Sequence, residues 1–85
     1  MTSSTYYAVL PFDRNEHGEL CPGEAVECRS VQSAVVQARL LAAEGVGAIA
    51  FSRTGDVDLG EYADAVIITR FGDVPTDLEA AAGAL

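Results

Sequence analysis

Residues 50–75, AFSRTGDVDLGEYADAVIITRFGDVP, decide how this chain folds. The stretch contains the end of one apolar run, residues 46–53, and the whole of a second, residues 63–71, with a polar loop between them. Short apolar runs bounded by glycine and aspartate are typical of strands. Residues 65–68 are continuously apolar, which indicates a strand covered on both faces. The stretch therefore predicts two neighbouring antiparallel strands, the second of them in the middle of a sheet.

Before this stretch, residues 30–44 have the pattern of a helix. Ser30 suits the N-cap position because its hydroxyl can accept a hydrogen bond from an unpaired backbone N–H. Gly45 follows the last turn, where a left-handed residue usually ends a helix. Two apolar stripes run along the helix at helical spacing. The first consists of Val31, Ala34, Val35, Ala38, Leu41 and Ala42, and the second, beside it, of Val36, Leu40 and Ala43.

The two ends of the chain complete the pattern. Residues 5–12, TYYAVLPF, are rich in β-forming side chains and predict a strand. Residues 24–28, EAVEC, fit a short return strand, although a Pro-Gly pair bends the chain just before them. Residues 75–84 predict a short final helix, in which Thr76 and Glu79 have the spacing of a capping box.

This order of elements predicts an α+β fold. A strand–helix–strand connection places its two strands parallel, so the strands at residues 5–12 and 46–53 should be parallel. The most apolar strand should then lie between them, as in a split βαβ unit. We expect a small mixed or antiparallel sheet of about three to four strands with one long helix on one face, followed by the short C-terminal helix. At 85 residues, the chain 1–85 should form a single domain.

The charge of the chain restricts its partners. Thirteen acidic residues outnumber five basic ones, for a net charge of −8. This excess argues against binding to nucleic acid or to an anionic membrane surface, and it favours either a basic protein as partner or simply solubility. The N-terminal residues lack the basic region and the long apolar run of a signal peptide, and no run approaches the roughly 18 apolar residues of a membrane span. We expect a cytoplasmic protein.

Residues 13–24, DRNEHGELCPGE, match much of the calcium-loop pattern. His17, however, stands where an oxygen ligand is required, and the strand-like segment before the loop is not the helix that should precede it. The alternative is a hairpin whose turn uses Asn15 and Gly18 for the backbone angles that they tolerate. We therefore expect no calcium site.

The two cysteines do not form a recognisable site either. Cys21 and Cys28 are seven residues apart, and the chain contains one histidine, so a zinc site with a close cysteine pair is not expected. His17 and Cys21 lack a third group that would orient them as a base and a nucleophile. In the cytoplasm both thiols should be reduced. We expect no metal and no cofactor.

A ligand site at one sheet edge is the main candidate for chemistry. In the predicted topology, residues 12–14 and 52–56 leave the sheet at the edge where its parallel strands end, which is where ligands bind in open α/β sheets. The backbone N–H groups there could bind an anion, although neighbouring carboxylates would repel it. A pair between Arg53 and either Asp64 or Glu61 is the simpler interpretation. The candidate residues are Arg14, Ser52, Arg53, Thr54, Gly55, Asp56 and Asp64.

Three phrases of the sequence, YYAVLPF, FSRTGD and GEYADAVIITRFGDVP, resemble a family of small bacterial proteins with no assigned function. The resemblance extends over residues 6–75 and implies only a short intracellular protein of this shape. Because the family has no known activity, the resemblance transfers no catalytic residue. The pattern is also loosely similar to peptidoglycan-binding domains of the βαββαβ type. The chain lacks the final strand of those domains and any export signal.

These observations favour an interaction module that forms a homodimer. One helix covers only one face of the sheet, so the second face and the second helix stripe would be left bare unless another copy covered them. The interface candidates are Val36, Leu40, Ala43, Val66 and Ile68. The alternative is a protein that binds a small ligand or an anion at the Arg14/Arg53 edge. An enzyme is not expected, because the chain has no serine–histidine–acid set, phosphate loop or dinucleotide fingerprint.

Overall fold

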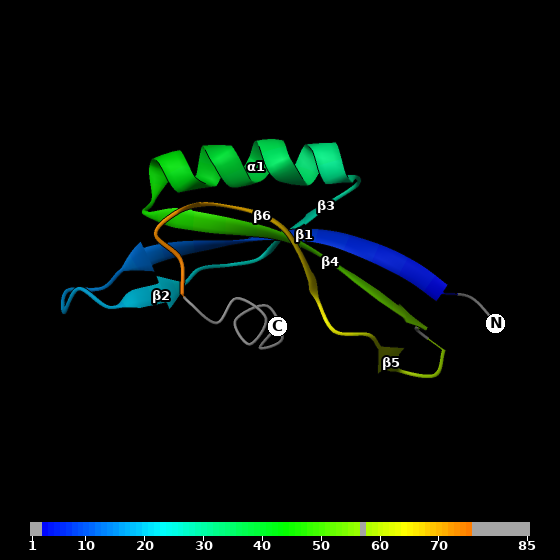
Figure 1. Cartoon of the computed structure of the whole chain (residues 1–85). Helices are drawn as coiled ribbons and strands as arrows, with labels where there is room; N and C mark the ends of the chain where they lie inside the picture. Colours follow the sequence, from blue (N-terminus) through cyan, green and yellow to red (C-terminus); the bar gives the residue numbers. More distant parts are fainter. Residues whose placement is uncertain (1–2, 57, 76–85) are drawn as a thin grey trace.

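The computed structural model describes residues 3–56 and 58–75, and it consists of one helix packed on an antiparallel sheet (Figure 1). The elements in chain order are β1 (Ser3–Arg14), β2 (Leu20–Pro22), β3 (Val26–Cys28), α1 (Val31–Glu44), β4 (Gly47–Asp56), β5 (Glu61–Tyr62) and β6 (Val66–Gly72). The α+β class is as the sequence predicts. The sheet has six strands rather than three or four. The helix predicted at residues 75–84, with its capping box, lies outside the described residues.

The six strands form four rows. β1 and β4 are the long inner pair, in register from Ser3 opposite Asp56 to Phe12 opposite Gly47. On the outer side of β1, β2 and β3 pair with its two halves. Strands β5 and β6 likewise pair with two parts of β4, on the side of β4 away from β1. The additional strands are therefore the interrupted halves of two outer rows.

The predicted parallel pairing of the first strand with β4 is wrong. β1 and β4 run antiparallel, because β3 intervenes between β1 and the helix and reverses the chain direction. The two parallel strands that α1 connects are β3 and β4, and β1 lies between them. The right-handed crossover rule applies to the strand directly before the helix. That strand is the three-residue β3, which falls within the short return strand predicted at residues 24–28.

β6 is not the central strand that its apolar sequence predicts. It pairs with β4 on one side, and no described strand pairs with its other side. A bulge interrupts the pairing: Ala50 lies opposite Thr69 and Phe51 opposite Ile67, which leaves Ile68 as an extra residue. By the ordinary alternation of a strand, Ile67 joins the core cluster on the far face and Ile68 the cluster under the helix, so the two apolar side chains face opposite sides of the sheet.

The helix begins as the sequence predicts. Ser30 has an extended backbone (φ −155°, ψ 167°), and its Oγ accepts the N–H of Ser33 at 3.1 Å, so it is the N-cap. The end differs from the prediction. Gly45 has φ −111° and ψ −137°, which is not a left-handed conformation, and its N–H donates to the carbonyl of Leu41 at 2.9 Å. With 14 residues, α1 is too short to cross a membrane, and no other helix occurs in the described residues.

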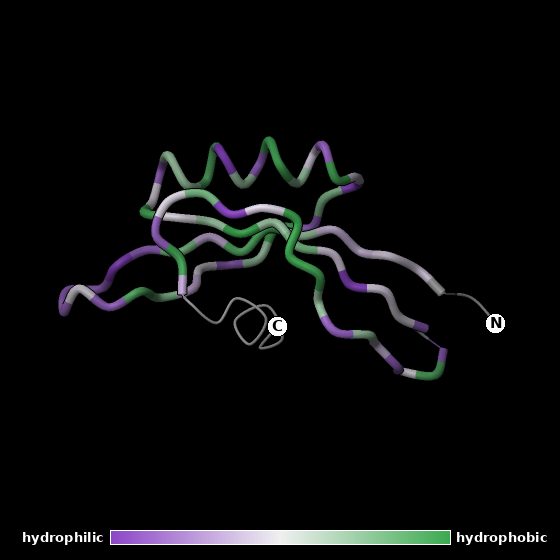
Figure 2. Tube along the Cα trace, in the orientation of Figure 1, coloured by the Kyte–Doolittle hydropathy of each residue, from purple (hydrophilic) through white to green (hydrophobic). Residues whose placement is uncertain are grey.

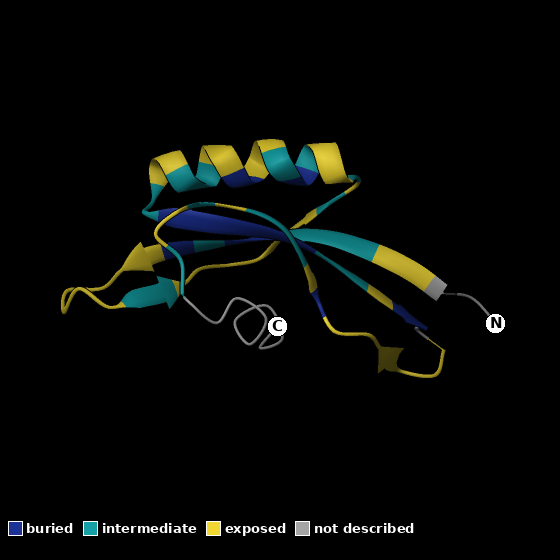
Figure 3. Ribbon diagram, viewed as in Figure 1, coloured by how far each residue is buried: buried dark blue, intermediate teal, exposed yellow. Residues whose placement is uncertain are grey.

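Two apolar clusters lie on the two faces of the sheet. The cluster under the helix is built from small side chains: Val9, Ala34, Ala38, Ala48 and Ala50, all completely buried. The far face holds larger ones: Leu10, Phe12, Ile49, Phe51 and Ala65, with Leu20, Val46, Ile67 and Val74 packed against them. Figure 3 shows burial concentrated in the inner strands and on the inward side of α1. The prediction that the far face is left bare is wrong for these residues.

The long strand pair extends beyond the helix. A helix of 14 residues is about 21 Å long at about 1.5 Å per residue, whereas the 12 residues of β1 span about 40 Å. The helix starts after Cys28, which lies opposite Tyr7, and ends near Gly47, which lies opposite Phe12. The remaining ends of β1 and β4 form an arm that carries the short strand β5 (Figure 1). The β1–β2 hairpin is largely hydrophilic (Figure 2).

The alanine-rich contact between helix and sheet gives a stability prediction. Ala38 is completely buried between α1 and β4, so Ala38→Leu should force the two elements apart and destabilise the protein by about 1–3 kcal/mol. Ala43→Leu, on the outward side of the same helix, should change stability by less than about 0.5 kcal/mol. Urea denaturation at low protein concentration measures both. Equal midpoints for the two variants would contradict the close packing.

Candidate functional site

The two arginines of the predicted ligand edge lie far apart. Because β1 and β4 are antiparallel, Arg14 ends β1 beside the start of β4, whereas Arg53 lies opposite Tyr6 near the other end of the pair. Arg14 instead holds the hairpin to the end of β6. Its Nη1 donates to the carbonyl of Gly18 at 2.7 Å, and its Nη2 lies 3.2 Å from Oδ2 of Asp73. Both charged side chains are largely exposed, so this ion pair contributes little to stability.

The calcium-like segment forms the β1–β2 hairpin. Asn15 organises its turn: its Oδ1 accepts the N–H groups of His17 (2.8 Å) and Glu19 (3.0 Å), and its backbone N–H donates to the carbonyl of Glu19 (2.9 Å). Gly18 supplies the positive φ of 79° that the turn requires. The side chain of Asn15 thus acts as an acceptor for the backbone, which is a different role from the tolerated backbone angle that we predicted.

The turn of this hairpin gives a prediction about stability. Asn15→Ala should destabilise the protein by about 1 kcal/mol, because two backbone donors lose their acceptor. Thermal denaturation measures this loss.

The same hairpin should not bind calcium. Millimolar calcium should leave the melting temperatures of the parent and the variant unchanged, since a ligand that binds only the native state must raise them. A calcium-dependent rise in the parent that Asp13→Ala removes would show that the loop binds the ion.

The remaining candidate residues are spread over both faces. Oδ1 of Asp56 accepts the N–H groups of Asp58 (3.0 Å) and Leu59 (3.3 Å), so this buried carboxylate closes the β4–β5 turn. Oγ1 of Thr54 lies 2.9 Å from Oγ1 of Thr5 across the strand pair. Ser52 is half-buried on the helix side, and Asp64 is exposed after β5. These residues and Arg14 therefore do not form one site.

Arg53 is half-buried on the far face of the sheet. Its Nε donates to the carbonyl oxygen of Ala63 at 3.3 Å. No ion pair joins it to Asp64 or Glu61, so the predicted pairing is wrong. Ala63 lies in the connection between β5 and β6. Its backbone carbonyl, and not the carboxylate of Asp64 or Glu61, is the hydrogen-bond partner of the guanidinium.

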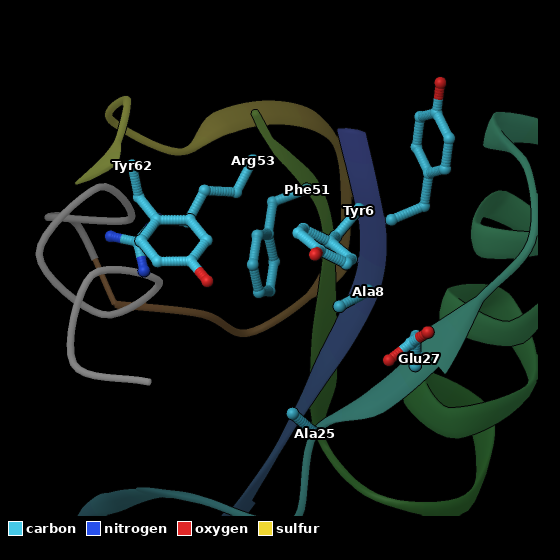
Figure 4. Close-up of a pocket in the computed structure, with 8 residues that line it drawn as sticks. Tyr6, Ala8, Ala25, Glu27, Phe51, Arg53 and Tyr62 are labelled. Carbon is cyan, nitrogen blue, oxygen red and sulfur yellow. The ribbon is translucent and has the colours of Figure 1, made fainter. Parts of the chain in front are cut away.

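Arg53 lies at one end of a cleft on the far face, which has a volume of about 370 Å³ (Figure 4). Tyr6, Ala8 and Phe51 line it from the inner strands, Tyr62 from β5, and Ala25 and Glu27 from the outer row beside β1. Tyr6 lies opposite Arg53, and Ala8 lies opposite both Phe51 and Glu27. Side chains of residues opposite one another share a face of a sheet, so this set points into one hollow.

The ring of Tyr62 is held in place at the cleft. Tyr62 lies opposite Gly55, and a Cβ at that glycine would overlap the ring, so the absence of a side chain admits the tyrosine over the backbone. The rings of Tyr6 and Tyr62 are 6.5 Å apart at an interplanar angle of 44°. Tyr62 is nevertheless 49% exposed. The protein thus presents an exposed aromatic ring that packs over Gly55 beside the cleft.

The cleft offers a positive and a negative group at separate ends. Figure 4 shows Arg53 and Tyr62 on one side and Glu27 on the other, with Phe51, Tyr6 and Ala8 between them. A second hollow of about 360 Å³ beside it is lined by Asp56 and Glu61, whose carboxylates would repel an anion. In the described residues, no group of three potential metal ligands comes together. Cys21 and Cys28 are free thiols.

Sequence reasoning identified Arg53 and missed the rest of this cleft. The chain has six aromatic residues, three tyrosines and three phenylalanines, and Tyr6, Phe51 and Tyr62 gather here although they come from three strands. The available signal was that two of these aromatic residues follow polar ones in the sequence: Tyr6 follows Thr5, and Tyr62 follows Glu61. Comparison of the chain with family models, with curated proteins and with solved structures finds no match.

The single hydrogen bond of Arg53 gives a stability prediction. Arg53→Ala should destabilise the protein by at most about 1 kcal/mol, because it removes one long hydrogen bond at the surface. Arg70→Ala, an exposed arginine of β6, is the matched control and should have no measurable effect. Chemical denaturation compares the two. A loss of several kcal/mol for Arg53→Ala alone would indicate that the guanidinium supports a larger buried network.

Proposed function

We propose that this protein is a small interaction module that self-associates as a homodimer through the outward face of α1. The observation that supports this proposal is the exposure of Val36 and Leu40, each 54% exposed on the side of the helix away from the sheet. Together with the exposed Ala43 they form the outer stripe, at spacings of four and three residues. Figure 3 shows this side of α1 as exposed, and Figure 2 shows hydrophobic residues on it.

Electrostatics favours this face for contact with a second copy. The chain carries a net charge of −8, so two copies repel one another over most of their surfaces. Helix α1 holds one arginine, Arg39, and one glutamate, Glu44, and is therefore neutral. A two-fold contact between two such helices brings apolar side chains together with the least repulsion.

The other interface candidates contribute unequally. Val66 is 62% exposed, and it lies opposite Ser52 on the helix side of the sheet, so it could extend the contact beyond the helix. Ile68 is half-buried in the cluster under the helix and supports the fold instead. Because the far-face cluster is buried, the outer stripe remains the main apolar surface for a second copy.

The size of the outer stripe indicates a weak dimer. A helix about 21 Å long and roughly 10 Å wide presents on the order of 200 Å² of outward footprint. Stable dimers bury about 800 Å² per partner. We therefore expect a weak dimer that forms only at high protein concentration. The carboxylates elsewhere favour a basic protein as an additional partner. We infer a cytoplasmic role and assign no catalytic activity to the chain.

Light scattering after size-exclusion chromatography tests the dimer. The weight-average mass should rise with concentration from the chain mass of 8.9 kDa towards twice that value. Added salt should strengthen the association, because it screens the repulsion between two acidic chains. A mass that stays at 8.9 kDa up to hundreds of micromolar would refute self-association.

Two helix variants locate the interface. Leu40→Glu places a charge in the outer stripe and should keep the protein folded but monomeric, since Leu40 is exposed. Gln32→Glu adds the same charge at another exposed position of the helix and should leave more of the association intact. Circular dichroism confirms that both variants are folded. Equal loss of association in the two would show that net charge, and not the stripe, controls the dimer.

A small-ligand-binding protein is the second candidate function. The cleft with Arg53 at one end supports it, whereas the separation of Arg14 from Arg53 removes the sheet edge that we first expected.

A further inference from the structure

We propose that the far-face cleft is a binding site for a small molecule with a flat aromatic body, an anionic group at one end and a hydrogen-bond donor at the other. This site is independent of the dimer, because the cleft lies on the face of the sheet opposite α1. The cleft volume of about 370 Å³ falls within the range of small-molecule sites, about 300–1,000 Å³.

Ala8 makes the hollow. In the ladder across the sheet, Ala8 lies between Phe51 on one side and Glu27 on the other, and Tyr6 precedes it by two residues on the same face. A methyl side chain among these larger neighbours leaves a depression in the sheet surface. Its floor consists of Ala8 and the buried ring of Phe51, and is therefore apolar.

The tyrosines make the walls suitable for an aromatic ring. The exposed Tyr62 is fixed over Gly55, and its centroid is 6.5 Å from that of Tyr6. Aromatic rings attract one another at centroid separations of about 4.5–7 Å in offset or tilted arrangements. A ligand ring on the Phe51 floor can meet both tyrosine rings without a rearrangement of the strands, so little conformational entropy is lost on binding.

Arg53 supplies the site for the anionic group. Its Nε is engaged with the carbonyl of Ala63, which orients the guanidinium, and no hydrogen bond joins Nη1 or Nη2 to another described residue. A guanidinium presents parallel N–H donors that match the two oxygens of a carboxylate. The anchored side chain therefore offers a bidentate partner beside the aromatic walls.

Glu27 determines the other end of the ligand. Its carboxylate accepts hydrogen bonds and repels anions, so it favours a donor group at the end of the ring farthest from Arg53. A ligand with an acid at one end and an amine at the other matches this order of charges. Glu27 would repel a ligand with acids at both ends. Arg53 would repel a ligand with charged amines at both ends.

NMR titration of the full-length chain with para-aminobenzoate tests the proposal. Amide shifts should concentrate at Tyr6, Ala8, Glu27, Arg53 and Tyr62. Aniline, which lacks the carboxylate, should bind about tenfold or more weakly, because the charged hydrogen bonds to the guanidinium are lost. Benzoate and cyclohexanecarboxylate should each bind more weakly by a few-fold at most, since the first lacks the donor and the second the aromatic face.

Matched variants separate the site from general effects of charge. Arg53→Gln should weaken the binding of para-aminobenzoate about tenfold or more. Arg14→Gln removes the same charge at the other end of β1 and should leave the binding unchanged. Ala8→Leu fills the hollow and should abolish binding, and Glu27→Ala, which removes the acceptor, should remove the preference for para-aminobenzoate over benzoate. Leu40→Glu should bind normally, which distinguishes this site from the dimer interface.

Three results would overturn the proposal. They are the absence of shifts at the solubility limit of para-aminobenzoate, shifts that centre on another surface, and normal binding by Arg53→Gln. The last variant keeps the test decisive if Ala8→Leu fails to fold, since Arg53 contributes one surface hydrogen bond to the fold.

Discussion

The antiparallel pairing of β1 with β4 is the interaction on which the rest of this structure depends. It joins residues between 35 and 53 positions apart in the chain, from Phe12 opposite Gly47 to Ser3 opposite Asp56. Every other strand pairs with one of these two, and the helix packs on both. Such non-local pairing has a loop-closure cost before any contact forms, and the gain comes from burying Val9, Leu10 and Ile49 in the same step.

The same pairing separates the two faces of the sheet by side-chain size. Alternation along β4 places Ala48 and Ala50 under the helix and Ile49 and Phe51 on the far face. Small residues let the helix approach closely, and large ones fill the far cluster. The two faces therefore present different surfaces: the helix presents the apolar outer stripe, whereas the far face presents an aromatic cleft beyond its buried cluster.

The pairing also determines which charged residues meet. In the predicted arrangement, Arg14 and Arg53 would have followed two parallel strands, one on each side of the central strand, at the same edge of the sheet. In the antiparallel one, Arg14 contacts the hairpin and Asp73, and Arg53 lies across from Tyr6 at the other end. Arg53 thus stands beside Tyr6 and Tyr62 without Arg14, and on this we base the proposal of a single anionic group on an aromatic body. Two clustered arginines would instead have favoured a polyanion.

The sequence by itself determined the elements whose signals are local. Helical spacing of apolar residues and the hydroxyl of Ser30 specify α1 and its start, and the runs of β-forming residues specify the three long strands. Arg53 was identified for the same reason, as a charge at a strand end. Only the tertiary structure decided the direction of β1 relative to β4, because the three-residue β3 changes it and carries too weak a periodic signal. The outer position of β6 was also decided there, because β1 occupies the other side of β4. The cleft could not be predicted, because Tyr6, Glu27, Phe51 and Tyr62 become neighbours through cross-strand register, which is set by how both faces of the sheet are packed.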